Sequence, residues 1–530
     1  MASDDKPIKK RAVAATFLFR FADGSGNQGK AEVALFRRSA QVRTYQHKLA
    51  PISGSVEPDD PSPLATAVRE IEEETTLKVG SDIELMRKGK SYSFTDDDIG
   101  RVWTVHPFAF RLKSTEEGGK GEAGITIDWE HEKWEWHDPH DISDSDEFGG
   151  VPRLTDSLRR VWPEYDLGSA AGAVLTAGLE DLRTDHESGA RVIAAKAVRA
   201  LRDVISKMSS IRMEVGTWWD NILPVAWHLC YNGRESMGAA IVSSLVTVLA
   251  RIEGLLKSDE EDTEEQKHQV ILEINEFLVQ RESTISRIGA AFIGYIESTV
   301  FNQQEPRIVL SVLTTSYSST ILSTLLGAAK FLNVALNVRI LESRPLCEGV
   351  TLASKLLEEP TLEDNIKVTL YTDASAAIAA QGVDVLLLGA DRISSEGDVS
   401  NKTGTLPVAL STRHVSPATK IIVVSEVEKI AGPGAINDHC VEDNSPIELT
   451  RIWDDEVKGA AAIRKYARKE HKDTALSVKN VYFEWLPAQL VDAYITDEGS
   501  WSLVDIKARS QKIGEETDKF FSRVWDRVGR

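Results

Sequence analysis

Apolar positions divide the chain into three stretches with different periodicities. From about residue 11 to 165, short β-type runs at 13–21, 31–37, 102–112 and 134–136 are separated by turns rich in Gly and Asp, and one helix is predicted near 63–76. Between about 168 and 300 the apolar spacing is helical, as in 191–195 and 241–256. From 306 onward, apolar runs alternate with helical segments.

The third stretch predicts a parallel sheet. Its apolar runs lie at 308–313, 338–341, 368–371, 385–388 and 421–424, and strands that alternate with helices form βαβ units. The nearly unbroken run before Gly389 suits a strand that is covered on both faces. We therefore predict an α/β multidomain protein: a domain of β-type runs with one helix at 1–165, a helical subdomain at 168–300, a Rossmann-like parallel-sheet domain at 306–510, and a tail or helix at 511–530.

Polar residues follow each predicted strand of this sheet, at the edge where open α/β sheets bind ligands. They are Thr314-Thr315-Ser316, Glu342-Ser343-Arg344, Thr372-Asp373, Asp391-Arg392 and Ser425-Glu426, with Lys429 just beyond. Ser318 and Ser319 open the helix after the first strand, where backbone amides can hold phosphate. Arg344 and Lys402 could supply positive charge. The pattern predicts a sugar-phosphate site, although Asp391-Arg392 alone fits a salt-bridged turn equally well.

Several motifs in this region occur together and in a specific order. GADRI at 389–393 is followed by NKTGT at 401–405, and Glu342-Ser343-Arg344-Pro345 precedes them with Gly349. Further matches are Asn480, Phe483-Glu484, Pro487, Asp492, Ile495-Thr496 and Gly499. Over roughly 170–510 the chain resembles the family of initiation factor two-B regulatory subunits, which also holds methylthioribose-1-phosphate isomerase and ribose-1,5-bisphosphate isomerase.

The resemblance implies roles for individual residues. The isomerases pair a cysteine with the aspartate of GADRI, so Asp391 carries over as a catalytic residue, with Asn401 and Lys402 in the substrate site. Where the isomerases have Thr-His-Cys, this chain has Thr314-Thr315-Ser316, so the residue at the position of the cysteine is Ser316. A serine hydroxyl needs a neighbouring base to act, so whether the site turns over or only binds is left open.

The resemblance also reaches the helical region and the assembly. Gly189 and Ala190 resemble the family's helical-domain substrate motif, although a glycine at a helix start is the commoner explanation. A homodimer through the C-terminal domain is implied, with small nucleotides or sugar phosphates as ligands.

The predicted helix near 63–76 places three carboxylates on one face. Glu70, Glu73 and Glu74 stand at i, i+3 and i+4. Their mutual repulsion costs about a few tenths of a kcal/mol per exposed pair. A hard cation such as Mg²⁺ or Mn²⁺ would remove that cost and could bridge a substrate's phosphates. A solvated acidic face is the alternative.

The surrounding residues favour the metal site. The segment 54–77 resembles the Nudix box, G-x5-E-x7-R-E-U-x-E-E-x-G-U, through Gly54, Arg69-Glu70, Ile71 and Glu73-Glu74. Asp60 stands in place of the first glutamate, one extra residue precedes Arg69, and Thr76 replaces the second glycine, whose positive φ a threonine resists.

The Nudix resemblance implies an α/β/α sandwich at 1–165. It also implies that Glu70, Glu73 and Glu74 hold Mg²⁺ or Mn²⁺, with Glu73 also catalytic, while water attacks a diphosphate linkage. A later loop often supplies a further carboxylate. The candidates are Glu130 and Glu132, with Glu130 preferred; as edge-strand charges, both are equally well explained without a role.

Composition narrows the setting. The chain has 530 residues, a net charge of −20 and three cysteines without metal-ligand spacing. So acidic a protein lacks the basic surface that nucleic acid and anionic membrane require, which argues against both as general partners. No apolar run approaches the ~20 residues of a membrane span, and the first twelve residues are too polar for a secretory signal. A cytoplasmic location is expected.

Two functional hypotheses follow. The first is a Nudix hydrolase of a nucleoside diphosphate-linked compound, fused to a sugar-phosphate-binding module similar to ribose-1,5-bisphosphate isomerase. The second is a non-catalytic regulatory or assembly protein of the initiation factor two-B type, in which a degenerate Nudix fold serves binding. Ser316 and Thr76 favour the second hypothesis, and the intact acidic helix favours the first.

Overall fold

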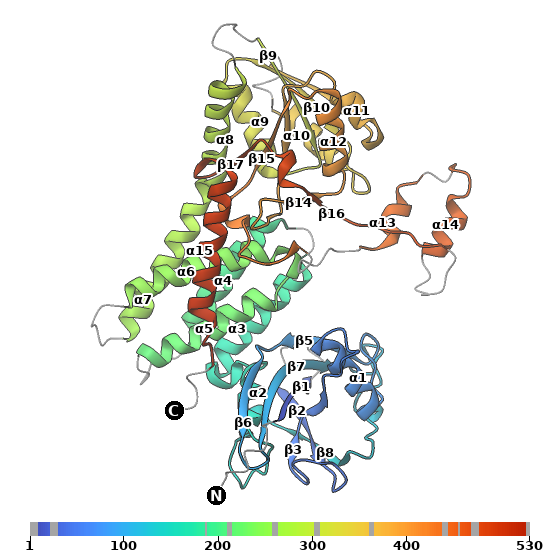
Figure 1. Cartoon of the computed structure of the whole chain (residues 1–530), viewed down its shortest axis with the longest axis vertical. Helices are drawn as coiled ribbons and strands as arrows, with labels where there is room; N and C mark the ends of the chain where they lie inside the picture. The colour runs from blue at the N-terminus through green and yellow to red at the C-terminus, as the bar shows by residue number, and fades with distance from the viewer. Residues whose placement is uncertain are drawn as a thin grey trace, which may run out of the picture.

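The computed structural model describes residues 9–21, 30–185, 188–208, 215–256, 263–301, 308–359, 365–436, 444–453, 456–467 and 476–525. The polar start of the sequence and the last five residues of the predicted C-terminal segment lie outside these ranges. Figure 1 shows a blue N-terminal region below, a group of long helices in the middle and a parallel sheet above. The protein is a mixed α/β multidomain chain, as the sequence predicts.

An eight-stranded sheet forms the N-terminal region within the described residues. Its central order is β3-β2-β1-β7-β5, while β4 pairs with β1, β6 with β7 and β8 with β2. The pair β1–β7 is parallel and the other pairs are antiparallel. The strands are β1 (Lys9–Phe21), β2 (Ala31–Arg38), β3 (Leu49–Ala50), β4 (Ile52–Ser55), β5 (Ile83–Lys88), β6 (Tyr92–Asp96), β7 (Arg101–Leu112) and β8 (His131–His137).

Helices cover both faces of this sheet because alternate strand residues are apolar on each side. Helix α1 (Pro63–Thr75) buries Ala67 and Ile71 against Leu18, Ile52 and Phe108. On the other face, α2 (Leu154–Arg159) packs with the core that contains Phe17 and Phe19. The predicted helix near 63–76 and the four predicted strand runs are confirmed by these elements.

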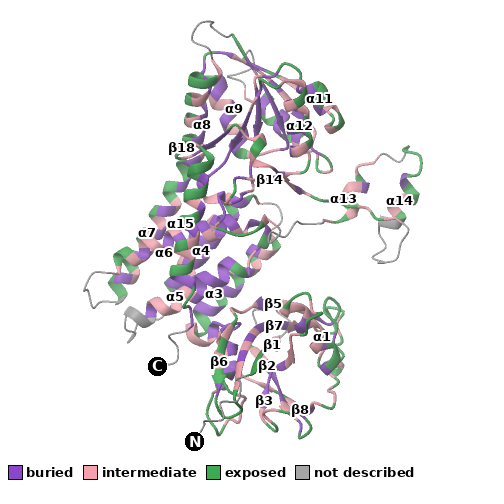
Figure 2. Cartoon of the chain, viewed as in Figure 1, coloured by how far each residue is buried: buried purple, intermediate pink, exposed green. Residues whose placement is uncertain are grey.

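The middle region is helical. It comprises α3 (Glu164–Thr184), α4 (Ala190–Lys207), α5 (Val215–Tyr231), α6 (Gly238–Leu255), α7 (Thr263–Gln280) and α8 (Thr284–Tyr295). The long C-terminal helix α15 (Leu503–Phe521) returns to this group, and its Phe520 and Phe521 join the helical core. Figure 2 shows the buried residues concentrated where these helices meet.

One stretch of the helical region corrects an expectation from the sequence. Residues Glu235–Leu255 are long and apolar enough to cross a membrane by length and composition, with a mean hydropathy of 1.5. More than half of that window, 56%, is buried inside the protein. The burial arises because α6 packs against α4, α5 and α15. This is the pattern of a core helix.

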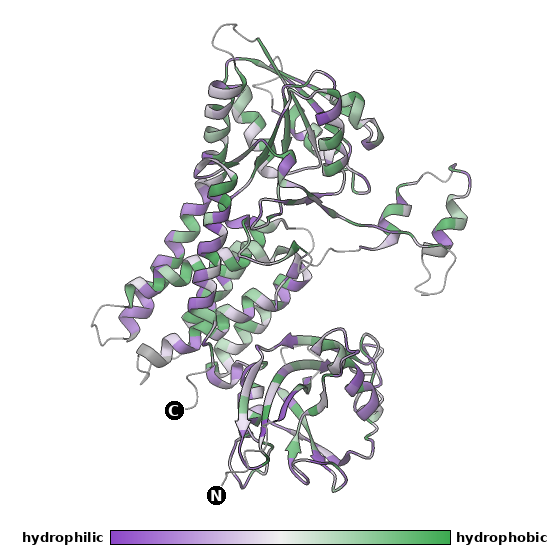
Figure 3. Ribbon diagram, viewed as in Figure 1, coloured by the Kyte–Doolittle hydropathy of each residue, from purple (hydrophilic) through white to green (hydrophobic). Residues whose placement is uncertain are grey.

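The upper region is built on a seven-stranded sheet, again within the described residues. Its order is β11-β10-β9-β12-β15-β17-β18, parallel apart from the last strand. The strands are β9 (Val309–Thr315), β10 (Ala335–Leu341), β11 (Ile366–Tyr371), β12 (Val385–Leu388), β15 (Lys420–Val424), β17 (Ala493–Thr496) and β18 (Gly499–Trp501). Figure 3 shows these strands as largely hydrophobic. All five predicted strands are present.

Helices lie on both faces of this sheet, as parallel strands require. Helices α8, α9 (Ser319–Phe331) and α10 (Glu348–Leu357) pack in one core. Helices α11 (Ala376–Ala379) and α12 (Thr405–Val415) pack in the other. The direction in which strands are added reverses between β9 and β12, and open α/β sheets generally bind ligands at the carboxyl ends of strands at such a reversal.

A small third sheet continues from that edge. Its strands β13 (Arg392–Ile393), β14 (Val399–Lys402) and β16 (Phe483–Leu486) are antiparallel. The short helices α13 (Pro446–Arg451) and α14 (Ala460–Ala467) extend away from the body of the protein (Figure 1).

A buried ion pair joins the N-terminal region to the helices. Both guanidinium nitrogens of Arg87, at the end of β5, donate to Glu164 at the start of α3, over 2.6 and 2.5 Å. Arg87 also donates to Thr176 over 2.7 Å and lies over the ring of Trp162. The pair is 2% and 6% exposed. Removing either partner would leave a buried charge without its counter-ion.

Substituting Glu164→Gln should therefore destabilise the protein by about 3–5 kcal/mol, the usual cost of breaking a buried pair. The matched control is Asp156→Asn, which removes the more exposed Arg153–Asp156 pair and should cost less than about 1 kcal/mol. Thermal melting followed by circular dichroism measures both. Equal melting temperatures for the two variants would contradict this role.

Candidate functional site

Helix α1 carries the acidic face, and its start is defined by its sequence. Ser62 is the N-cap, with its side chain accepting from the amide of Ala65, and Pro63 occupies the first turn. Thr76, at the other end, adopts the left-handed conformation with φ 61°. The expectation that threonine resists the positive φ of the box glycine is thus corrected: Thr76 takes the glycine-like conformation, and its hydroxyl donates to the carbonyl of Gly124 over 3.3 Å.

Gly54 lets Glu70 approach the strand that precedes α1. A Cβ atom built on Gly54 would lie 1.8 Å from Cδ of Glu70, which no structure tolerates. The first glycine of the box therefore has a packing reason, since any side chain would displace the carboxylate of Glu70.

Asp60 acts on Arg69 and stays apart from the acidic face. It accepts from Nη2 and Nε of Arg69 over 3.0 and 3.3 Å, from the amide of Glu57 and from the hydroxyl of Thr66. These donors, Arg69 above all, hold the pKa of Asp60 well below its usual range. Asp60, which stands in place of the first glutamate of the box, thus holds the guanidinium of Arg69 in position.

Arg69 in turn holds two of the three predicted metal ligands. Its Nη1 donates to Glu70 over 2.7 Å and to Glu73 over 3.2 Å. Glu73 is exposed, whereas Glu70 is mostly buried. In this structure the arginine supplies the positive charge that a cation would otherwise bring.

Glu74 is the buried member of the set. Burial raises its pKa well above the usual value, and the nearby carboxylates of Glu70, Glu130 and Asp128 raise it further. Its Oε2 lies 2.5 Å from Nε2 of His131, while Oε1 is buried without a hydrogen-bond partner in the structure. One oxygen is therefore anchored and the other is left to accept a ligand.

Glu130 joins this group and Glu132 does not. Burial raises the pKa of Glu130, with Asp128 and Glu73 as the nearby negative charges. Glu132 instead pairs with His47 over 2.8 Å. Asp128 and His131, which sequence reasoning missed, flank Glu130 in the same segment; an Asp and a His beside a candidate carboxylate were the available signal.

The donor set has the chemistry of a site for a hard cation. Carboxylate oxygens crowd together, and Glu74 has an orphaned buried oxygen, which is what Mg²⁺ or Mn²⁺ would satisfy. Among the residues that the structure describes, however, no three acidic, His or Cys side chains are already arranged around one point. Arg69 would have to release Glu70 and Glu73 for these residues to bind metal.

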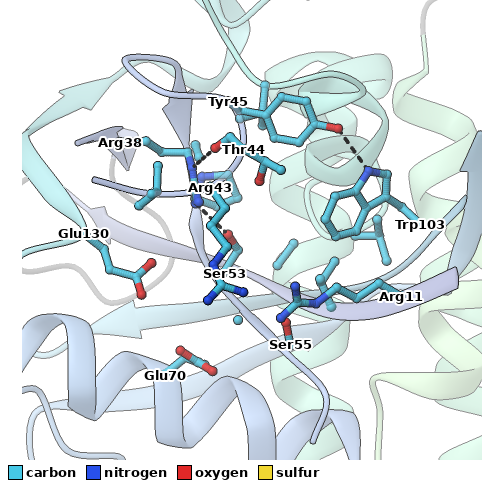
Figure 4. A pocket seen from close by; sticks show the side chains of 18 of the residues that line it. Arg11, Arg38, Arg43, Thr44, Tyr45, Ser53, Ser55, Glu70, Trp103 and Glu130 are labelled. Carbon is cyan, nitrogen blue, oxygen red and sulfur yellow. Dashed lines mark hydrogen bonds between the residues drawn. The ribbon is translucent and has the colours of Figure 1, made fainter. Parts of the chain in front are cut away.

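A cavity of about 480 Å³ opens beside the acidic group. Figure 4 shows Glu70 and Glu130 on one side, the ring of Trp103 on the other, and Arg11 and Arg43 between them. Carboxylates that could hold a cation, guanidinium groups that could bind phosphate and an aromatic surface therefore share one cavity.

The aromatic side of this cavity is held rigidly. The hydroxyl of Tyr45 donates to Asp96 over 2.5 Å and accepts from the indole of Trp103 over 3.0 Å. Tyr45 has a positive φ of 55°, an uncommon backbone conformation for a bulky residue. Arg38 donates to the carbonyl of Thr44 over 3.2 Å and so supports the same loop.

A second candidate site lies at the carboxyl ends of β9 and β12. Burial raises the pKa of Asp391, and the nearby ammonium groups of Lys429 and Lys402 oppose that rise. Lys429 donates to the carbonyl of Ala390 over 2.7 Å and pairs with buried Glu426 over 2.9 Å. The structure thus brings Asp391, Lys402 and Lys429 together, as their strand positions predict.

Ser316 meets a partner that the sequence did not reveal. Its hydroxyl donates to Oε2 of Glu348 over 2.9 Å, and Oε1 of Glu348 lies 3.3 Å from Nζ of Lys402. Glu348 begins α10. In the sequence, only the motif residue Gly349, which directly follows Glu348, pointed to this position. The carboxylate that serine needs is therefore present, although no histidine stands beside it.

Other predicted residues of this site hold structural positions. Ser318 is the N-cap of α9, accepting from the amide of Thr320, and Ser319 is the first helical residue. Buried Asn401 donates to Thr405 over 3.0 Å. Arg344 pairs with Glu342 over 3.0 Å and its guanidinium is half exposed, so its role as a phosphate ligand stays a prediction.

Gly189 and Ala190 lie at the start of α4, in the helical region. A Cβ on Gly189 would meet no atom within 4 Å, so packing does not require the glycine. Arg281 connects this helix start to the second site, because it donates to the carbonyl of Arg191 over 2.8 Å and to Glu428 over 2.6 Å. Glu428 directly precedes Lys429.

Comparison with known proteins finds a family match for the N-terminal region and another for the helical and C-terminal regions. Residues 186–502 match the model of the initiation factor 2 subunit family, and residues 11–158 match that of the NUDIX domain. A methylthioribose-1-phosphate isomerase from Vitis vinifera is 27% identical over 44% of this chain and 59% of its own length. One from Heliobacterium modesticaldum is 34% identical over 30% of this chain and 41% of its own length. The chain spans about half the length of these curated relatives.

Solved structures of the same kind are more distant. The beta subunit of eIF2B from Chaetomium thermophilum is 16% identical, with 67% of this chain and 96% of that chain covered and a TM-score of 0.46. The 5-methylthioribose 1-phosphate isomerase from Pyrococcus horikoshii OT3 is 20% identical, with 64% and 87% covered and a TM-score of 0.43.

His131→Ala should weaken Mn²⁺ binding about 10–100-fold, the usual effect of removing a residue that orients a ligand, because Glu74 loses the partner of its anchored oxygen. His131→Gln, which can still donate a hydrogen bond, should restore part of the affinity. Electron paramagnetic resonance of free Mn²⁺ measures binding without any turnover. The control is Glu132→Gln, which removes a charge from the same strand. Unchanged affinity in His131→Ala would rule out the positioning role.

Proposed function

Because the chain belongs to the initiation factor 2 subunit family and also carries a NUDIX domain, we propose that it combines a metal-dependent hydrolase with a sugar-phosphate-binding module. The hydrolase would cleave a nucleoside diphosphate-linked compound. The observation that carries this proposal is the position of Glu70, Glu73 and Glu130 on the wall of a cavity that also presents arginines and an aromatic surface.

The acidic residues would hold the metal and move the proton. Glu70, Glu73 and Glu74 supply carboxylate oxygens for Mg²⁺ or Mn²⁺, which when bound would neutralise charge on the diphosphate and make water a stronger nucleophile. Glu130, whose pKa is raised by burial and by Asp128, would accept the proton of the attacking water. Water adds to one phosphorus, the bridging P–O bond breaks, and two phosphate products result.

The remaining walls suit the other parts of such a substrate. Arg11, Arg38 and Arg43 line the cavity and could bind phosphate oxygens. Trp103, held by Tyr45, offers a flat surface on which a nucleobase could stack. With metal bound, Arg69 would release Glu70 and Glu73 and would keep its pair with Asp60.

The C-terminal part would bind a pentose phosphate on a Rossmann-like sheet. The strand order, with its reversal between β9 and β12, supports this use. Asp391 could act in proton transfer, with Ser316 and its partner Glu348 opposite and Lys402 and Lys429 supplying positive charge. The sugar-phosphate ligand is supported by the relatives, which are named as methylthioribose-1-phosphate isomerases. We also propose that the protein forms a homodimer through this domain and lies in the cytoplasm.

A non-catalytic regulatory role is the alternative for the C-terminal part. It is favoured by the serine at position 316, since an alkoxide is far harder to form than the thiolate of the isomerases. Under this alternative the pocket binds its ligand without converting it.

For the hydrolase, Glu73→Gln should lower kcat about 10²–10⁴-fold across a panel of nucleoside diphosphate sugars, the range seen when acid–base or metal-assisted steps are disabled. The control is Glu72→Gln, whose side chain pairs with Lys78. Release of mononucleotide in the presence and absence of Mg²⁺ gives the rate. A Glu73→Gln rate equal to that of Glu72→Gln would refute the assignment.

For the second part, separate incubations with ribose 1-phosphate and with ribose-1,5-bisphosphate distinguish the two roles. The isomerase reading predicts a ketose product that is lost in Asp391→Asn, because that variant cannot transfer a proton. Calorimetric titration of both proteins shows whether binding persists. Binding without product in the unsubstituted protein would establish the regulatory alternative.

A further inference from the structure

Glu348 occupies the place where a ligand's anionic group would be expected. It lies at the first position of α10, and each carboxylate oxygen has its own partner: Oε2 accepts from the hydroxyl of Ser316, and Oε1 pairs with Nζ of Lys402. A hydroxyl and an ammonium group converging on one carboxylate also form the kind of donor set that binds phosphate. In this chain the protein itself fills it.

The other cations near the pocket are also paired. Lys429 is held by Glu426 in a buried ion pair, and Arg344, which the sequence offered as a phosphate ligand, pairs with Glu342. The charges that act on Asp391 are two ammonium groups and two carboxylates, Glu348 and Glu426.

Lys402 has a second set of contacts that keeps it in place. Its ammonium lies 4.9 Å from the ring centroid of Tyr482 and 5.0 Å from that of Phe483. These cation–π contacts come from the start of β16 and the residue before it. Lys402 is therefore fixed from one side by aromatic rings and from the other by Glu348, and a ligand anion would have to compete with a carboxylate that is already present.

We propose that Glu348 is the specificity-determining residue of this pocket: it excludes a phosphate group from Lys402 and Ser316, so that the site takes a pentose with one phosphate in preference to a pentose bisphosphate. This inference rests on the proposed sugar-phosphate function and narrows its ligand class. A neutral hydroxyl of the sugar can donate to Glu348, whereas a second phosphate dianion meets its negative charge at close range.

The pairing explains why the charge of Glu348, and not its size, should matter. Gln has nearly the same shape and can still accept from Ser316, but it neither neutralises Lys402 nor repels phosphate. The side chain is 25% exposed and stands at a helix start, so the substitution leaves the core unchanged. Any gain in phosphate affinity then reports the removed charge.

The test is calorimetric titration of the full chain and of Glu348→Gln with ribose, ribose 5-phosphate and ribose 1,5-bisphosphate. The unsubstituted protein should bind the monophosphate at least as tightly as the bisphosphate. In Glu348→Gln the bisphosphate should gain about 10-fold or more in affinity, because a like charge beside a partly buried site is removed. Affinity for ribose should change less than about twofold.

The matched control is Glu358→Gln, which removes one negative charge from the other end of α10, where Glu358 accepts from the hydroxyl of Ser354. An equal gain in that variant would show a general charge effect and overturn the proposal. A loss of bisphosphate affinity in Glu348→Gln would also overturn it, by showing that Glu348 orients Lys402 for binding; the function proposed above would then still stand. Should neither protein bind any ribose phosphate, both proposals fail. Glu348→Ala, with its folding checked by circular dichroism, repeats the test if the Gln variant does not fold.

Discussion

Mutual repulsion among carboxylates is the constraint around which the N-terminal region is arranged. Glu70, Glu73 and Glu74 share one face of α1, and Glu130 and Asp128 approach from the segment at the start of β8. Arg69 offsets part of this repulsion, and Asp60 fixes Arg69. Glu74 is the buried member of the group, and its Oε1 has no hydrogen-bond partner in the structure, so this oxygen is available to a cation.

Carboxylates also gather around Asp391 in the second site, and there lysine side chains offset their repulsion. Each ammonium group near Asp391 has a carboxylate partner, so the pocket is pre-organised without a ligand. The turn that carries Lys429 is also tied to the helical region, because Arg281 and Ser244 both contact Glu428. The N-terminal region is linked to the same helices through Arg87 and Glu164. The two candidate sites thus share one helical support.

Local sequence signals predicted the framework well. Apolar runs gave the five parallel strands, and Ser62 and Pro63 marked the start of α1, because these signals depend on neighbouring residues alone. Strand ends also predicted that Asp391, Lys402 and Lys429 would meet, since the carboxyl ends of parallel strands share an edge. The conformation of Thr76 was misjudged because tertiary contacts, here with Gly124, can hold a residue in a conformation that it resists by itself.

Pairings between distant side chains could not be predicted. Glu348 reaches Ser316 and Lys402 from a helix start whose orientation depends on the whole sheet. His131 and Glu74 lie 57 positions apart in the sequence. The geometry of ionic contacts is set by packing, which a one-dimensional pattern does not contain.

The most direct measurement is anomalous diffraction from crystals soaked in Mn²⁺. The account predicts a manganese peak bound by Glu70, Glu73 and Glu74, with Arg69 withdrawn from Glu70 and Glu73 and still paired with Asp60. A saturated soak with no peak at these carboxylates and with the Arg69 contacts intact would contradict it.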